Sequence, residues 1–164
     1  MDKEIDIILK EGSMVQFCEV TWDIETKVKK LTENFNIHPW SFYNLFPPDL
    51  HDHYYKGIKV EDAGFIIALA SIGSIQYELV QPLWGVSSHR DFLEKHGEGF
   101  HHIKLYYKDI EKAKAIFKKR GIFVLEEGFF RDDHWVYFDT EKEHGIFWEI
   151  GNCPDVGKPA RVYP

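Results

Sequence analysis

The chain of 164 residues is poor in cysteine: Cys18 and Cys153 are the only two, and they do not form a C-x-x-C pair. This spacing argues against a disulfide framework and against a thiolate zinc site. We expect both to be small buried residues. No run approaches the ~20 apolar residues of a membrane span, and residues 1–4 lack the basic-then-apolar order of a secretory signal. We therefore expect a cytoplasmic protein that has no membrane partner.

Positive charge is also scarce. Twenty Lys and Arg stand against 27 Asp and Glu, which gives a net charge of −7, and no basic stripe offsets it. Such a chain repels phosphate backbones, so nucleic acid is not an expected partner. Apolar residues, in contrast, are plentiful at 44%, with 16% aromatic. That is enough apolar surface for one packed domain or two small fused modules.

Two segments of the chain share one register. Residues 15–22 are dense in β-formers and lead to Asp23, which is a good N-cap for a helix with apolar residues at helical spacing. The segment that starts at His102 repeats this order and leads to Asp109 as the N-cap. Gln16 precedes Asp23 by the same seven residues that separate His102 from Asp109. This repetition indicates an internal duplication.

The similarity continues after each predicted helix. Each half ends in an apolar strand that carries one glutamate: Glu78 in residues 75–80, with a turn expected at Pro82, and Glu149 in residues 146–150. The predicted fold is α+β, with two tandem βαβββ modules that form a curved mixed sheet around a cleft. The expected limits are an N-terminal arm (1–13), a first module (14–83) with an insertion (38–62), a linker helix (84–98), a second module (99–151) and a C-terminal tail (152–164).

Four polar side chains of this pattern could form one site. Side chains alternate along a strand, so Gln16 and His102 are expected on the face that the helices leave uncovered. Glu78 and Glu149 lie in apolar strands, where an unpaired carboxylate would cost several kcal/mol. Any single glutamate would be explained by a structural ion pair, with Lys104 or Arg131 as the candidate partner. The matched pair instead favours a shared site.

With pseudo-twofold symmetry these four side chains would converge and offer three oxygens and one imidazole nitrogen. Two carboxylates balance a divalent cation, and a mostly oxygen ligand set suits Co²⁺, Mn²⁺ or Ni²⁺, with Zn²⁺ as an alternative. The other metal-like segment, His51-Asp52-His53, lies in a Pro-rich stretch and is expected to be solvated.

Several motifs resemble a known family. The most specific are Y-E-L-V-Q-P-L (77–83), F-L-E-K-H-G-E-G-F-H-H-I (92–103), Y-F-D-T-E-K-E-H-G-I-F-W-E-I (137–150) and I-H-P-W (37–40). They are similar to the vicinal oxygen chelate superfamily, which includes glyoxalases, bleomycin-resistance proteins and dioxygenases, and within it to the methylmalonyl-CoA epimerase and glyoxalase-like branch. This resemblance implies a paired βαβββ fold whose cleft holds a metal with two open positions for substrate oxygens.

By position, the resemblance implies Gln16, Glu78, His102 and Glu149 as the metal ligands, with His102 preferred over His101 by the seven-residue register. It also implies two catalytic carboxylates on opposite sides of the substrate α-carbon. One would be Glu149, and the other would be Glu61 or Asp62. A carboxylate can abstract a proton α to a thioester when a cation stabilises the enolate oxygen.

The function expected from this resemblance is a metal-dependent isomerase that acts by enolate chemistry on a small acyl thioester, as methylmalonyl-CoA epimerase does. The partner would be a CoA or glutathione thioester, and the protein could be a homodimer. Gln16 stands where epimerases usually have histidine, so a glyoxalase I-like lactoylglutathione lyase is one alternative. Another is a metal-free protein of the same fold that binds aromatic compounds or drugs. An extradiol dioxygenase is disfavoured because it needs two histidine ligands.

Overall fold

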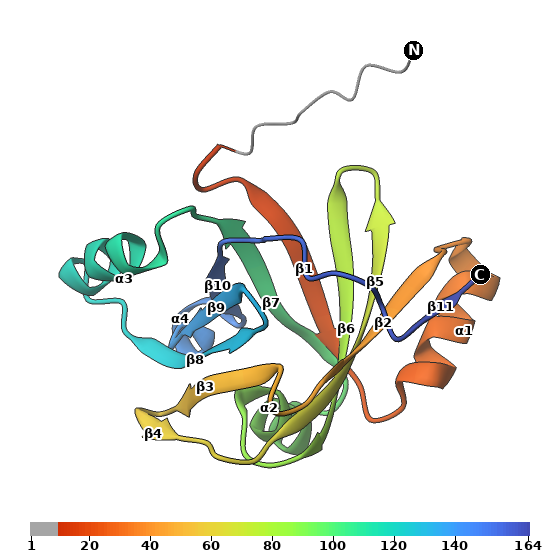
Figure 1. Cartoon of the computed structure of the whole chain (residues 1–164), viewed down its shortest axis with the longest axis horizontal. Helices are drawn as coiled ribbons and strands as arrows, with labels where there is room; N and C mark the ends of the chain where they lie inside the picture. The colour runs from red at the N-terminus through yellow and green to blue at the C-terminus, as the bar shows by residue number, and fades with distance from the viewer. Residues whose placement is uncertain (1–9) are drawn as a thin grey trace.

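A computed structural model describes residues 10–164, so residues 1–9 of the predicted N-terminal arm lie outside the described part (Figure 1). The first half of the chain contains β1 (Met14–Val20), α1 (Ile24–Phe35), β2 (Trp40–Leu45), β3 (Leu50–Tyr55), β4 (Ile58–Lys59), β5 (Gly64–Ile72) and β6 (Ile75–Trp84). After α2 (Ser88–His96), the second half contains β7 (Gly99–Tyr106), α3 (Ile110–Lys119), β8 (Val124–Phe130), β9 (Asp133–Phe138), α4 (Glu141–His144), β10 (Phe147–Gly151) and β11 (Arg161–Tyr163).

The two predicted strand-to-helix units are both present. Asp23 caps α1 by accepting a hydrogen bond from the backbone N–H of Thr26 at 3.1 Å, and Asp109 caps α3 from that of Lys112 at 2.9 Å. In each unit a strand runs directly into the capped helix, as the shared register predicted. The capping aspartates thus mark equivalent positions in the two halves of the chain.

All strands of the described residues belong to one mixed sheet, in the order β11-β2-β5-β6-β1-β7-β10-β9-β8-β3-β4. Strands β1 and β7 are antiparallel at its centre, and each has a parallel partner, β6 for β1 and β10 for β7. Figure 1 shows this sheet curving between α1 and α3, which lie at opposite ends of the molecule. The α+β fold with two related halves and a curved mixed sheet is confirmed.

The sheet separates three apolar clusters. Phe17 of β1 packs with Ile24 and Val28 of α1, whereas Leu105 of β7 packs with Ile110 and other residues near α3. A third cluster lies between the halves and contains residues of both, including Cys18, Phe65, Val80, Trp135 and Tyr137. The faces of β1 and β7 opposite the helices therefore line the interior, where the candidate site lies.

Two local features differ from the expectation. Strand β6 does not turn at Pro82 but continues to Trp84. Its pairing with β1 ends at Val80, so Pro82 lies where one edge of the strand is free and a missing N–H is tolerated. The predicted insertion supplies β3, which pairs with β8 of the second half. Within residues 10–164, no helix is long and apolar enough to cross a membrane.

Candidate metal centre

Glu78, His102 and Glu149 come together on the inner face of the sheet. They lie on β6, β7 and β10, and each is at most 8% exposed. The Nε2 atom of His102 is 3.2 Å from Oε2 of Glu78 and 2.9 Å from Oε2 of Glu149. Strand register produces this meeting, because the Cα partner of Cys18 is Glu78 on one side and His102 on the other. Three of the four predicted ligands thus converge.

Both separations from His102 Nε2 suit ligands that share one cation. His102 Nε2 and Glu149 Oε2 are both fully buried; they form an ion pair at 2.9 Å, and neither atom has a hydrogen-bond partner among the described residues. Ligand atoms about 2.1 Å from a common ion at right angles lie about 3.0 Å apart. The separations of His102 Nε2 from Glu78 Oε2 and from Glu149 Oε2 are close to that value. In the metal-free protein the protonated imidazole of His102 pairs with these carboxylates, and a bound cation would take the place of its proton.

Gln16 lines the same cavity as Glu78 and Glu149 and is 5% exposed. Its Nε2 donates a hydrogen bond to Oε1 of Gln76 at 2.6 Å. A side-chain amide binds cations through its oxygen, and this contact leaves that oxygen available. Gln76 holds the amide of Gln16 in place, a role that the sequence did not suggest.

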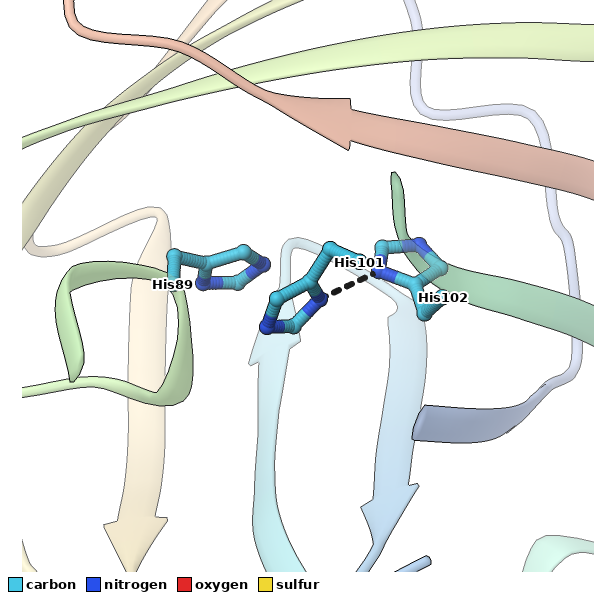
Figure 2. Close-up of side chains that lie close together, drawn as sticks. All are labelled: His89, His101 and His102. Carbon is cyan, nitrogen blue, oxygen red and sulfur yellow. Dashed lines mark hydrogen bonds between the residues drawn. The ribbon is translucent and has the colours of Figure 1, made fainter. Parts of the chain in front are cut away.

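A neighbouring histidine fixes the ring of His102. The Nδ1 atoms of His101 and His102 lie 3.0 Å apart and share a hydrogen bond (Figure 2). When His102 donates this bond, its Nε2 carries the lone pair that faces the two carboxylates. Buried partners of this kind set the tautomer and orientation of metal-binding histidines.

The second close pair in Figure 2 has a different geometry. The rings of His89 and His101 are stacked, with centroids 4.4 Å apart and an angle of 22° between their planes. Histidine binds metals through lone pairs in the plane of the ring, and stacked faces do not direct these to one point. Instead, Nε2 of His89 lies 3.2 Å from the hydroxyl oxygen of Tyr137. Ring nitrogens of the three histidines lie within 4.8 Å of one another, but Nδ1 of His101, Nδ1 of His102 and Nε2 of His89 already have hydrogen-bond partners.

Charges dominate the electrostatics of the centre. Burial by itself lowers the pKa of His102, but the negative charges of Glu149 and Glu78 outweigh burial and raise it to about 9. Burial raises the pKa of Glu149, while the charges of Lys104 and His102 overcome that effect and lower it. Glu149 is therefore ionised at neutral pH, and a cation that binds His102 must displace a proton.

The predicted ion pair between a strand glutamate and Lys104 is also present. Lys104 Nζ lies 3.2 Å from Oε1 of Glu149 and 3.3 Å from Oδ2 of Asp133. Glu149 therefore forms this ion pair through one oxygen and lies beside His102 through the other. Asp133 was not singled out from the sequence, where nothing distinguishes it from Asp132.

The site opens into a cavity of about 240 Å³. Its polar lining includes Gln16, Glu78, Lys104, Asp133 and Glu149, which come from both halves of the chain. Its apolar lining is largely aliphatic and aromatic: Leu45, Phe65, Ile67, Leu69, Val80, Phe130, Trp135 and Val156. A small, mostly apolar cavity with a few convergent charged groups is the usual form of a small-molecule site.

Comparison with known families agrees with this architecture. Residues 15–138 match the family described as the Glyoxalase/Bleomycin resistance protein/Dioxygenase superfamily. The chain belongs to this superfamily. None of the curated proteins compared with the sequence matches it.

Solved structures of this superfamily's fold resemble the chain at low sequence identity. A hypothetical protein from Bacillus halodurans C-125 is 19% identical, with a TM-score of 0.68 over 89% of this chain and 97% of that one. Methylmalonyl-CoA epimerase from Mycobacterium tuberculosis is 14% identical, with a TM-score of 0.63 over 94% and 92%. A methylmalonyl-CoA epimerase in complex with methylmalonyl-CoA and NH4+ is 16% identical, with a TM-score of 0.62 over 92% and 100%. These likenesses establish the fold.

Within this glyoxalase-type fold, the two other predicted catalytic carboxylates lie away from the cavity. Glu61 is on the surface, 3.8 Å from Lys59, with 79% of its side chain exposed. Asp62 is also exposed and accepts a hydrogen bond from the indole N–H of Trp84 at 2.7 Å. Both precede β5, which begins at Gly64, so neither belongs to the strand whose residues line the cavity.

The surroundings of two buried side chains were not foreseen. Cys18 is buried as expected, but its sulfur also lies within 4.8 Å of ligand atoms of Glu78 and His102. His53 was expected to be solvated, yet it is 2% exposed and lies 2.7 Å from Glu126. The reason is the pairing of β3 with β8, which turns this part of the insertion inward. No local sequence signal reports such a distant pairing.

Proposed function

We propose that this member of the superfamily is a metal-dependent isomerase that acts by enolate chemistry on a small acyl thioester, in the manner of methylmalonyl-CoA epimerase. The observation that supports the proposal most directly is the convergence of His102 Nε2 with one oxygen each of Glu78 and Glu149 at a buried point beside a cavity. The burial of an imidazole nitrogen beside carboxylate oxygens from both halves of the chain supports a cation at that point.

Under this proposal, Gln16, Glu78, His102 and Glu149 hold the divalent metal, which is Co²⁺, Mn²⁺, Ni²⁺ or Zn²⁺. When bound, the metal supplies positive charge beside a substrate oxygen that becomes negative during the reaction. Gln76 orients the amide of Gln16, and His101 orients the ring of His102. The apolar walls exclude water, which strengthens every charge interaction inside the cavity.

Proton transfer is assigned to carboxylates that reach the cavity. Glu149 is ionised and can accept the proton next to the thioester carbonyl. The second carboxylate is Asp133, which lines the cavity, in place of Glu61 and Asp62, which do not. Return of a proton to the other face of the carbon would invert its configuration. Glu61 or Asp62 could take this role only if their segment moved toward the cavity.

The thioester class is supported by size and by the structural relatives. A cavity of about 240 Å³ can hold a short acyl group, while a bulky carrier such as CoA would extend outside it. Two similar structures, at 16% identity each, are epimerase complexes with methylmalonyl-CoA or with 2-nitronate-propionyl-CoA, the second being a Streptomyces coelicolor variant. Their ligands make these acyl-CoA compounds the first substrates to test.

The decisive experiment follows deuterium exchange at the α-carbon of methylmalonyl-CoA in D₂O by NMR. The purified protein is stripped of metal and reloaded with Co²⁺, Mn²⁺, Ni²⁺ or Zn²⁺. We expect exchange with at least one metal, none in the stripped protein, and none in a His102→Ala variant incubated with the same metals. Absence of exchange with every metal removes the epimerase assignment. A parallel assay with the hemithioacetal of methylglyoxal and glutathione tests the glyoxalase I-like alternative, which Gln16 favours.

A metal-free binding protein is the second candidate, and one observation favours it. Lys104 already supplies a positive charge to Glu149, and aromatic side chains such as Phe65, Phe130 and Trp135 line the cavity. Metal analysis after growth in supplemented medium separates the two candidates. Less than a tenth of an equivalent per chain, with no uptake on reconstitution, would favour the binding protein.

A further inference from the structure

Lys104 occupies an unusual position for a lysine. Its residue is 5% exposed, its side chain lines the cavity, and its ammonium contacts Glu149 Oε1 and Asp133 Oδ2 at 3.2 and 3.3 Å. Fully buried lysines are rare and need paired charges. This one pairs with the same glutamate whose other oxygen lies 2.9 Å from His102.

The surrounding backbone makes room for this side chain. Gly151 follows Glu149 on β10, and a Cβ atom at Gly151 would collide with Cε of Lys104. Lys104 and Glu149 are also direct Cα partners across β7 and β10. The lysine is therefore built into the strand pairing, and its position does not depend on a flexible loop.

The equivalent position in the first half of the chain has no charge like that of Lys104. Position 18 of β1 is equivalent to position 104 of β7: Cys18 is the partner of Glu78, as Lys104 is the partner of Glu149. Cys18 has no ammonium group, although its sulfur lies within 4.8 Å of ligand atoms of Glu78 and His102. One ligand carboxylate thus has a fixed ammonium beside it, and its counterpart has none.

We propose that Lys104 is a built-in counter-cation of the metal centre, which weakens divalent metal binding and restricts Glu149 to binding through one oxygen. The inference rests on the metal site of the proposed function. Its physical basis is charge: the two glutamates and Asp133 carry three negative charges, and Lys104 neutralises one of them a few Å from the ion. Like charges at this range repel strongly in a buried site.

The effect of the Lys104 ammonium would be to make metal binding reversible. With Lys104 present, Glu149 Oε1 is held by an ammonium and only Oε2 faces His102. The carboxylate then cannot close around the ion with both oxygens, which leaves a coordination position for a substrate oxygen. A purely structural ion pair of Lys104 with Asp133 would predict no effect on metal affinity beyond general destabilisation.

The test compares Mn²⁺ affinity, measured by equilibrium dialysis at fixed pH and ionic strength, among four stripped proteins: wild type, Lys104→Met, Asp133→Asn and Lys112→Met. Lys112 is exposed on α3 and controls for the change in net charge. We expect Lys104→Met to bind about tenfold more tightly or better, Asp133→Asn to bind more weakly than wild type, and Lys112→Met to be unchanged. Circular dichroism melting verifies that each protein is folded.

The double variant Lys104→Met/Asp133→Asn removes one buried charge of each sign and guards against misfolding of the single variant. The double variant should bind Mn²⁺ more tightly than Asp133→Asn by about the same factor as Lys104→Met exceeds wild type. Equal or weaker binding after loss of Lys104, in either background, overturns the inference while the proposed metal site stands. If neither wild type nor the lysine variants bind any of Mn²⁺, Co²⁺, Ni²⁺ or Zn²⁺, both the inference and the proposed function fall.

Discussion

His102 Nε2 lies 2.9 Å from Glu149 Oε2, with both atoms fully buried and no hydrogen bond between them. Two strands of the same half, β7 and β10, bring these residues together as parallel neighbours. The first half supplies Glu78 from β6 to the same nitrogen. A centre that takes ligands from both halves should bind its ion with a strong dependence on each ligand.

Removal of the imidazole should abolish stabilisation by metal. For wild-type protein, a divalent ion at about 100 times its dissociation constant should raise stability by about 2.7 kcal/mol, or roughly 5–10 °C in melting temperature. His102→Ala should show no such shift, and His144→Ala, which alters an exposed histidine, should behave as wild type. Thermal melts with and without Co²⁺ provide the measurement. A full shift in His102→Ala would place the ion elsewhere.

Replacement of His101 by phenylalanine should weaken metal binding without unfolding the protein. The ring of His101 stacks on His89, and phenylalanine preserves this shape but loses the hydrogen bond to His102. Loss of such an orienting partner typically costs about 10- to 100-fold in metal affinity. Competition against a coloured chelator would measure it. An unchanged dissociation constant in a stably folded His101→Phe variant would show that the contact has no orienting role.

Stability should fall as the pH drops below about 6.5, partly because of His89. Burial, with help from the charges of His102 and His53, lowers the pKa of His89 well below its usual value, so it is neutral in the folded protein. The unfolded chain binds a proton there below pH ~6.5, which favours unfolding by at most about 1.4 kcal/mol per pH unit. Above pH 6.5 both states are neutral and His89 has no effect.

Urea unfolding at pH 7.5 and pH 5.5 checks this dependence. His89→Gln should lose about 1 kcal/mol less stability than wild type between the two values, since it has no imidazole to protonate. His144→Gln serves as the exposed control and should follow wild type. An equal loss in wild type and His89→Gln would assign the acid sensitivity to other groups.

Glu61→Gln and Asp62→Asn should leave α-proton exchange within about twofold of wild type, because neither side chain lines the cavity. Asp133→Asn and Glu149→Gln should each reduce it by about 100-fold or more, as expected for loss of a general acid or base. Steady-state kinetics on methylmalonyl-CoA separate these outcomes. A large loss of exchange activity in Glu61→Gln would assign the role of second catalytic carboxylate to Glu61. Its segment would then have to close over the cavity.

The sequence by itself determined the duplicated architecture. Asp23 and Asp109 are helix caps set by local chemistry, and the alternation around Gln16 and His102 decides which side faces a helix. These signals extend over a few residues, so periodicity and capping rules can detect them. The equivalence of Glu78 and Glu149 was also detectable, since each lies in the closing strand of its half.

Only the tertiary structure decided which groups surround those ligands. Lys104 was recognisable as an ion-pair partner, but its link to Asp133 depends on how β7, β9 and β10 pack. Glu61 lies outside the cavity lining because it precedes β5, which begins at Gly64. His53 is buried because β3 pairs with β8. Such contacts join residues far apart in the chain, and no local propensity encodes them, because they arise from strand register and sheet curvature.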